Sequence, residues 1–304
     1  MFELYKGEFY ALFTALFWVF GALIFESLGK KNGADSINIL RLIFAFVFLS
    51  VFTFFSRDLV LPTDATMEAW LWLLLSGIIG FALGDLFLFK AFVMIGARIS
   101  MLIMSLAPPV AAFLGWLILD ETLTTFQFLG IAVTLLGVSI VVLQKDSRTD
   151  ENSNKRIKKL KYPMIGILLA FGGAIGQGTG LVISKIGMGD YDAFAASQIR
   201  IMAGIVGLGI YITFTKGWQK VINPMKKRRT VGLIAIGSVF GSFLGISFSL
   251  LAIQNTNTGV ASTIMAIQPI LLIPASVIAF KEKVNFIEIV GAIIAVGGVA
   301  LFFV

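Results

Sequence analysis

The stretch from Met101 to Leu119, MLIMSLAPPVAAFLGWLIL, is apolar along its length and carries two adjacent prolines, Pro108 and Pro109, near its centre. A proline inside a helix removes a backbone hydrogen bond and clashes with the preceding turn, at a cost of roughly 3 kcal/mol. In lipid the freed carbonyl finds no water, so such a break is tolerated where other helices or a water-filled cavity satisfy it. The stretch therefore predicts a membrane-spanning helix that is kinked beside an internal cavity.

The composition of the whole chain is that of an integral membrane protein. Of the 304 residues, 58% are hydrophobic and 13% are charged, and the mean hydropathy is +0.95, whereas soluble proteins carry about 25% charged residues. Cysteine and histidine are both absent, which removes disulfides, thiol nucleophiles and the usual zinc ligands. We therefore expect no metal and no cofactor. The net charge of +7 is expected on cytoplasmic loops and does not indicate a nucleic-acid partner.

Apolar runs of about 20 residues, the length that crosses a bilayer core, recur along the chain. They predict an all-α membrane protein with ten transmembrane helices, at approximately residues 8–28, 35–56, 70–93, 97–119, 124–144, 162–186, 191–215, 230–254, 258–280 and 284–304. One long polar connector, QKDSRTDENSNKRIKKLKY from Gln144 to Tyr162, has the charge density of a flexible linker. It divides the chain into residues 1–144, a linker at 145–161, and residues 162–304.

The second unit repeats the first. Matching residues are offset by 161 positions, or by 159 near the start of each unit, and the aligned pairs include Gly80 with Gly241, Pro108 with Pro269, Glu121 with Glu282, and Arg41 with Arg200. Because five spans per unit is an odd number, the second unit enters the membrane from the opposite side, and the repeats are inverted. In secondary transporters of this kind the substrate site lies near the midplane between the repeats. Pro108 and Pro269 would then be equivalent midplane kinks and candidate hinges.

On these features the chain resembles the drug/metabolite transporter superfamily, in its EamA-type branch. The stretches that support this are residues 84–138, beginning GDLFLFKAF, and residues 245–299, beginning GISFSLLAI. The resemblance covers both halves. It implies ten helices in two inverted five-helix repeats, and transport of small metabolites such as amino acids or related compounds, often outward.

Ionisable residues inside the predicted spans cost at least about 2.5 to 3.5 kcal/mol each at the bilayer centre, so each needs a reason. Similar depths predict that Arg41 pairs with Asp85, with Glu26 and Lys90 nearer the same surface as further partners. Arg200 repeats Arg41 at the opposite mouth, where an isoleucine replaces the aspartate. A carboxylate-bearing substrate would suit that mouth, and Asp85 or Glu26 would carry any coupling proton. The alternative is a static ion pair that orients helices.

A ligand pocket is mostly apolar with a few placed polar groups, and several residues near the predicted midplane fit that description. Neutral hydrogen-bonding groups come from glutamine and serine, and aromatic faces from tryptophan and phenylalanine. Each of these side chains could instead serve packing alone. The candidate substrate-binding residues are Trp18, Gln177, Ser242, Phe243, Ser247 and Gln268.

Lysine and arginine gather in the linker and in the loops on the same side of the predicted membrane. The positive-inside rule then places the linker in the cytoplasm and both termini outside a plasma (inner) membrane. We expect a secondary-active exporter of small metabolites, with a lipid bilayer, a small-molecule substrate and possible protons as partners. The alternatives are a passive channel or lipid scramblase, and a membrane-embedded enzyme. For the enzyme, Ser184 and Lys185 cannot form a local dyad, because adjacent helical positions point in different directions.

Overall fold

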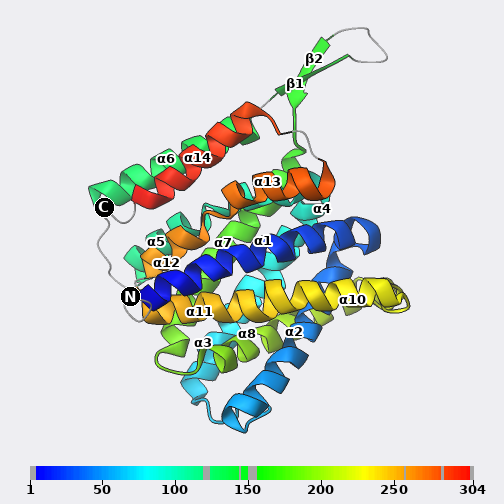
Figure 1. The fold of residues 1–304 in the computed structure, drawn as a ribbon, viewed down its shortest axis with the longest axis vertical. Helices are drawn as coiled ribbons and strands as arrows, with labels where there is room; N and C mark the ends of the chain where they lie inside the picture. Colours follow the sequence, from blue (N-terminus) through cyan, green and yellow to red (C-terminus); the bar gives the residue numbers. More distant parts are fainter. Residues whose placement is uncertain are drawn as a thin grey trace.

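The structure is a computed structural model that describes residues 5–118, 124–143, 145–149, 156–256, 258–281 and 284–301. It is a bundle of apolar helices with one pair of short strands at an edge (Figure 1). Six helical stretches are long and apolar enough to cross a membrane, and shorter apolar helices accompany them. Glu121 and Glu282 of the predicted repeat lie outside the described residues.

The first half begins with two long helices and continues through a stretch whose helical type changes twice. Its elements are α1 (Lys6–Asn32), α2 (Ala34–Arg57), α3 (Met67–Gly77), the π-helix η2 (Ile78–Gly84), α4 (Asp85–Met104), α5 (Ala107–Ile118) and α6 (Thr125–Val142). Within α4, Gly96 has φ +81° and ψ 158°, a conformation that glycine adopts without penalty. The chain therefore turns at Gly96, and its C-terminal part is a separate short helix over residues 97–104.

The second half follows the same order of elements. They are α7 (Met164–Met188), α8 (Ala193–Phe214), a short α9 (Trp218–Met225), α10 (Arg228–Gly237), the π-helix η3 (Ser238–Leu244), α11 (Gly245–Asn255), α12 (Thr258–Met265), α13 (Gln268–Phe280) and α14 (Phe286–Ala300). The helices α10, α13 and α14 begin 161 residues after α3, α5 and α6. The two π-helices recur with them, and sequence periodicity did not predict either one.

The charged connector differs from the prediction. It was expected to be a flexible linker, but β1 (Lys145–Thr149) and β2 (Arg156–Leu160) pair as antiparallel strands, with Lys145 opposite Leu160. A polar segment can form such a ribbon because strand pairing satisfies backbone groups without an apolar core. The ribbon projects from the side where α1 ends, opposite both chain termini (Figure 1).

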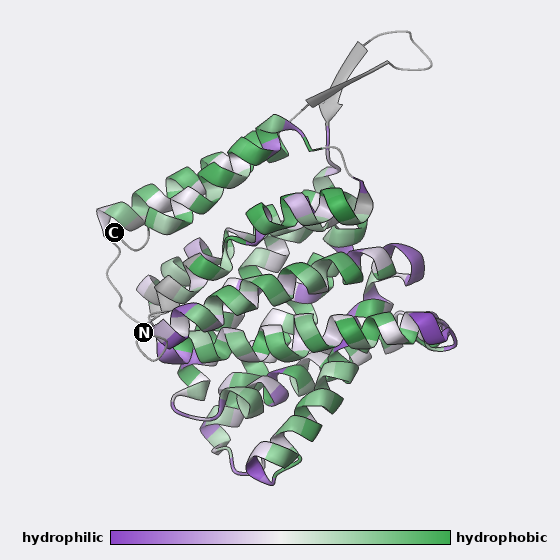
Figure 2. Ribbon diagram, viewed as in Figure 1, coloured by the Kyte–Doolittle hydropathy of each residue, from purple (hydrophilic) through white to green (hydrophobic). Residues whose placement is uncertain are grey.

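Hydrophobic residues predominate along the helices, and hydrophilic residues concentrate at the helix ends and in the loops (Figure 2). Phe55, Phe214 and Ile278 are each at least 80% exposed. A soluble protein rarely exposes so much apolar surface, whereas lipid tails are a suitable solvent for it. This surface agrees with an integral membrane protein.

Helices from the two halves pack against each other in crossed pairs. The α1 backbone touches η3, where a Cβ on Gly21 would lie 2.7 Å from the Gly241 Cα, and α7 touches η2, where a Cβ on Gly180 would lie 3.1 Å from the Gly80 Cα. Gly180 and Gly80 are the repeat equivalents of Gly21 and Gly241. Small residues let helix backbones approach closely in membranes. The same contact is thus made twice, with the roles of the halves exchanged.

The pair α6 and α14 lies along one edge of the bundle (Figure 1) and its helices run antiparallel. Gly298 lies against Thr134, while Gly291, nearer the start of α14, lies against Val141, nearer the end of α6. The Thr134 hydroxyl lies 3.3 Å from the Ala295 carbonyl oxygen as a hydrogen-bond donor. The two helices occupy the same place in each half, and they meet head to tail.

This interface provides a matched test of glycine packing. Gly298→Ala would place its Cβ against the Thr134 backbone nitrogen, whereas Gly297→Ala meets nothing within 4 Å. Overpacking costs typically about 1–3 kcal/mol, and alanine in an open helical position stabilises by roughly 0.5–1 kcal/mol. We expect thermal unfolding in detergent to show a lower melting temperature for Gly298→Ala and an unchanged or higher one for Gly297→Ala. Equal shifts would contradict the close α6–α14 packing.

Candidate functional site

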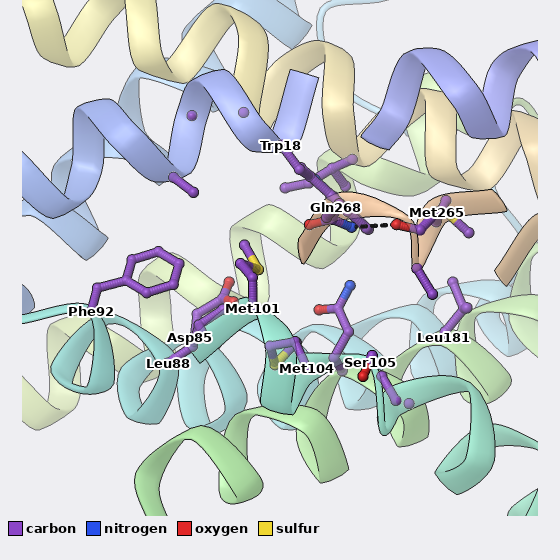
Figure 3. A pocket seen from close by; sticks show the side chains of 18 of the residues that line it. Trp18, Asp85, Leu88, Phe92, Met101, Met104, Ser105, Leu181, Met265 and Gln268 are labelled. Carbon is purple, nitrogen blue, oxygen red and sulfur yellow. Dashed lines mark hydrogen bonds between the residues drawn. The ribbon is translucent and has the colours of Figure 1, made fainter. Parts of the chain in front are cut away.

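A cavity of about 110 Å³ lies between α1, α4, α7 and the junctions α4–α5 and α12–α13. Its wall is mostly apolar, and polar groups enter it at Asp85, Ser105 and Gln268 (Figure 3). Among the described residues, the Ser262 hydroxyl and the Gln268 Oε1 are buried without a hydrogen-bond partner, and both residues line this space. Buried polar atoms are normally paired, so these two are available to a ligand or water.

The two proline-bearing stretches are broken helices, which differs from the predicted kink. α4 ends at Met104 and α5 begins at Ala107, while α12 ends at Met265 and α13 begins at Gln268. Pro108 and Pro269 are therefore in the first turn of a new helix, where the missing N–H has no helical partner to lose. Both line the cavity. The breaks shape the cavity wall, and the prolines begin the helices that follow them.

Side chains complete the hydrogen bonding at the breaks. The Ser105 hydroxyl donates to the Leu102 carbonyl (2.6 Å). Across the cavity, the Gln268 Nε2 donates to the Met265 carbonyl (2.8 Å), as drawn in Figure 3. Each of these side chains satisfies a carbonyl at the end of the preceding helix. The Gln268 amide thus has one end fixed and the other end open.

The predicted contact between Arg41 and Asp85 is present. The two side chains form a buried ion pair and a hydrogen bond. Arg41 also donates from Nη1 to the Ser242 hydroxyl (3.0 Å) and from Nε to the Asn38 Oδ1 (3.1 Å). Its guanidinium carbon lies 4.6 Å from the centre of the Phe89 ring. Arg41 is therefore fully engaged, as a buried charge requires.

Glu26 and Lys90, predicted as further partners of this pair, lie elsewhere. Glu26 accepts hydrogen bonds from Lys30 (2.5 Å) and from the backbone nitrogen of Ala97 (3.0 Å). It thereby caps the short helix that follows Gly96, which a carboxylate stabilises through the helix dipole. Lys90 donates to the Tyr211 hydroxyl (2.9 Å) and lies 3.8 Å from Asp35. Glu26 and Lys90 were expected nearer the same surface as the pair, but each points to a different helix neighbour.

Arg200 also differs from the prediction, which placed it at the opposite mouth with no acid nearby. It is buried, at 4% exposure, and its charge attracts that of Asp85. Its guanidinium carbon lies 4.7 Å from the centre of the Phe81 ring. Phe81 and Asp85 both line the cavity, whereas Arg200 does not. Arg200 is therefore one layer behind the wall.

Of the six predicted substrate-binding residues, three line the cavity and three do not. Trp18, Gln177 and Gln268 are in the wall. Phe243 instead packs in an aromatic cluster, with its ring 5.7 Å from Phe52. Ser242 is a partner of Arg41, and Ser247 is buried outside the wall with its hydroxyl unpaired among the described residues. Both serines are therefore on helix faces that do not line this cavity.

Sequence reasoning missed wall residues that the repeat could have identified. Most of the wall consists of equivalent positions from the two halves, and these pairs are Trp18 and Gln177, Ala22 and Leu181, Asp85 and Ile246, Met101 and Ser262, Met104 and Met265, Ser105 and Ala266, Ala107 and Gln268, and Pro108 and Pro269. Projecting each candidate onto its equivalent would have found Phe81 from Ser242, Ala107 from Gln268 and Ile246 from Asp85, but not the methionines or Ser262, which match one another.

Other wall residues have no equivalent in the wall. Among them, Phe25, Arg41, Phe89 and Phe92 line the cavity, but their repeat equivalents Ser184, Arg200, Leu250 and Ile253 do not. The cavity therefore extends from the shared centre toward the end of α1, the side that bears the strand pair (Figure 1).

Sequence reasoning also missed a charged cluster around Glu288, in the first turn of α14. Glu288 is 3% exposed, with the Arg98 Nη2 at 3.0 Å and the Lys161 Nζ at 2.7 Å. The Tyr162 hydroxyl donates to it at 2.8 Å. Burial and the Glu288 carboxylate raise the pKa of Tyr162, so Tyr162 remains a donor. This cluster ties α14 to α4 and to the segment before α7.

The catalytic alternative finds no support at Ser184. Its hydroxyl donates to the carbonyl of Gly180 (2.5 Å) and lies 3.3 Å from the Ser76 hydroxyl. A serine that bonds its own helix in this way is a packing residue. No cluster of three or more potential metal ligands occurs in the part of the chain that the structure describes.

Helices with an apolar outer surface, around a mostly apolar cavity that a few polar and charged groups enter, define a multi-spanning membrane protein with an internal site. The model of the EamA-like transporter family matches residues 5–143 and again residues 164–304. The chain belongs to the EamA-like transporter family.

Relatives are consistent with this membership. An uncharacterized transporter of Buchnera aphidicola subsp. Schizaphis graminum is 32% identical over 47% of this chain and 45% of its own length. The uncharacterized inner membrane transporter YhbE of Escherichia coli K12 is 29% identical over 46% and 43%. These matches thus span less than half of either relative. An uncharacterized transporter of Clostridium kluyveri is 21% identical over 96% of this chain and 91% of its own.

A solved crystal structure without a functional description superposes on 97% of this chain and 96% of its own, with a TM-score of 0.65 and 15% sequence identity. At that identity the likeness concerns the fold alone.

Proposed function

We propose that this protein is a secondary-active transporter that exports small metabolites, such as amino acids or related compounds, by alternating access. The observation that carries the proposal is the cavity at the meeting of two broken helices, lined by equivalent positions from both halves. Broken helices near a repeat interface are a recurrent way to build a transport site. The cavity also extends from its centre toward the end of α1, as expected of a transport site that is open to one side of the membrane in one of two states.

In this proposal, ten membrane helices form two inverted five-helix repeats, residues 1–144 and 162–304, joined by the connector at 145–161. The antiparallel α6–α14 pair and the doubled glycine crossing support the inversion. Both features are those of two units related by a twofold axis. Exchanging the conformations of the two units would then close the present opening and create its equivalent on the other side.

Trp18, Gln177 and Gln268 are the proposed substrate contacts, because they are polar or aromatic and lie in the shared centre of the wall. Asp85 is the proposed proton carrier, because it is an acid that lines the cavity. Glu26 and Lys90 hold helix ends in place. No cofactor or metal is needed for this mechanism.

Flux into sealed proteoliposomes tests the proposal. A transporter gives saturable uptake that unlabelled substrate competes with, and a proton gradient drives accumulation. A channel does not saturate readily, a scramblase moves labelled lipid between leaflets, and an enzyme changes the compound. Any of these three results, with no saturable flux, would overturn the proposal.

The prolines at the breaks are proposed hinges, and their replacement is expected to slow turnover. A proline disfavours helical geometry in the residue before it, so Pro108→Ala with Pro269→Ala would ease helix formation across each break, although Pro109 still opposes it at the first one. We expect several-fold slower flux, with stability changed by less than about 1 kcal/mol because the first turn needs no N–H. Pro274→Ala is the control, since Pro274 lies inside α13 and outside the cavity wall. Normal turnover in the double variant would refute the hinges.

We further propose that the side bearing the strand pair is cytoplasmic and that both termini lie outside. The support is the concentration of basic residues on that side, among them Lys30, Lys31, Lys226, Lys227, Arg228 and Arg229. A reporter active only in the cytoplasm, fused after Val304, is expected to stay silent, while the same reporter inserted between β1 and β2 is expected to be active. A strong signal from the C-terminal fusion would reverse the orientation.

A further inference from the structure

Arg200 carries a buried positive charge without a matched partner. It is 4% exposed, and its Nε is enclosed with no hydrogen-bond partner among the described residues. Nor does any other part of its guanidinium hydrogen-bond or ion-pair with a residue in the described ranges. Asp85, the acid that its charge attracts, is already held by Arg41. Two arginines therefore share one carboxylate.

The comparison with Arg41 shows what Arg200 lacks. Arg41 has three polar partners, Asn38, Asp85 and Ser242. Their repeat equivalents are Ser197, Ile246 and Phe81, respectively. Ser197 donates instead to the Ala193 carbonyl (2.8 Å). Arg200 is thus the same guanidinium, in the same place in its repeat, with its partners removed.

A buried charge persists only where something compensates for it, because an isolated one costs several kcal/mol. In the present state the cavity reaches Arg41 and stops at Phe81, one layer from Arg200. If the repeats exchange conformations, the new opening is lined by the equivalents of the present one. Arg200 then replaces Arg41 in the wall, beside an isoleucine where Arg41 has an aspartate.

We infer that the transported molecule supplies the missing group, so that its carboxylate pairs with Arg200 when the cavity opens to the side away from the strand pair. The inference rests on the proposed alternating access and adds the substrate class, which is small carboxylate anions. Bidentate pairing with a carboxylate is the interaction that a guanidinium makes best. The substrate carboxylate takes at Arg200 the position that Asp85 takes at Arg41.

The test uses the purified full chain and a panel of carboxylic acids of two to six carbons, including amino acids, each paired with its carboxamide. Binding is measured by thermal stabilisation, and flux by competition in proteoliposomes. We expect one or more acids, and none of the amides, to stabilise the wild type. Arg200→Gln is expected to weaken that binding about 10- to 100-fold, as for loss of a charge-assisted hydrogen bond.

A second variant keeps the inference testable if Arg200→Gln fails to fold. Ile246→Asp gives Arg200 its own carboxylate and should abolish acid binding while raising the melting temperature without ligand. Ile246→Asn is the matched control of similar shape without charge. Unchanged acid binding in Ile246→Asp would overturn the inference, as would a panel in which no acid binds. Saturable flux of an amide or amine that no acid competes with would preserve the transporter and overturn only its anionic substrate.

Discussion

Asp85→Asn is expected to abolish proton-driven accumulation of substrate in proteoliposomes. Asparagine cannot exchange a proton, and Asp85 is the acid proposed to do so at the cavity wall. The substitution also leaves Arg41 without its counter-charge, and removing one member of a buried ion pair costs about 3–5 kcal/mol. We therefore expect a lower melting temperature in the same variant.

The two effects of Asp85→Asn separate in a double variant. Arg41→Gln with Asp85→Asn removes both charges of the pair and is expected to recover part of the stability, since Arg200 still loses the attraction of Asp85, but not the driven transport. If Asp85 is only part of a static ion pair, the double variant would transport normally with unchanged pH dependence. That result, or pH-dependent accumulation in Asp85→Asn alone, would remove the coupling role.

The second large effect is expected at Glu288. Glu288→Gln would leave Arg98 and Lys161, at 12% and 26% side-chain exposure, without the carboxylate between them. We expect a loss of about 3 kcal/mol in the free energy of unfolding, because two partly buried cations would then repel each other.

Glu68→Gln is the control for this effect. Glu68 also lies in the first turn of a helix, but it is exposed, and it should lose only the helix-dipole contribution of roughly 0.3–1 kcal/mol. Denaturant or thermal unfolding of both variants decides between them. Equal losses would mean that the Glu288 cluster contributes no more than the dipole does.

The positions of the long apolar helices were largely predictable because length and hydropathy identify a segment that can cross a membrane. Residues 191–215 were predicted and α8 covers Ala193–Phe214. The break within the stretch from Met101 to Leu119 was placed at the prolines, but the chain breaks just before them, since a proline is better tolerated in a first turn. The π-helices had no signal in hydropathy, which depends on which residues are apolar and not on hydrogen-bond register.

The candidate site was predicted in part for the same reason. Polar residues in apolar stretches can be found from sequence, which is how Arg41 and Asp85 were identified. Which face they occupy depends on the rotation of each helix, and a π-turn changes that rotation between Ser242 and Ser247. The Glu288 cluster depends on a contact between α14 and residues more than a hundred positions away, which no local pattern reveals.

The crossed packing has a consequence for how this chain becomes a folded molecule. The principal neighbours of α1, α4 and α6 are α11, α7 and α14, all from the other half. Neither half is then a self-sufficient folding unit, and assembly must wait until the last helix has entered the bilayer. The covalent connection through the strand pair keeps the two halves close, but the helix contacts hold them together. Two separately synthesised fragments, cut between β1 and β2, are therefore expected to associate through these contacts.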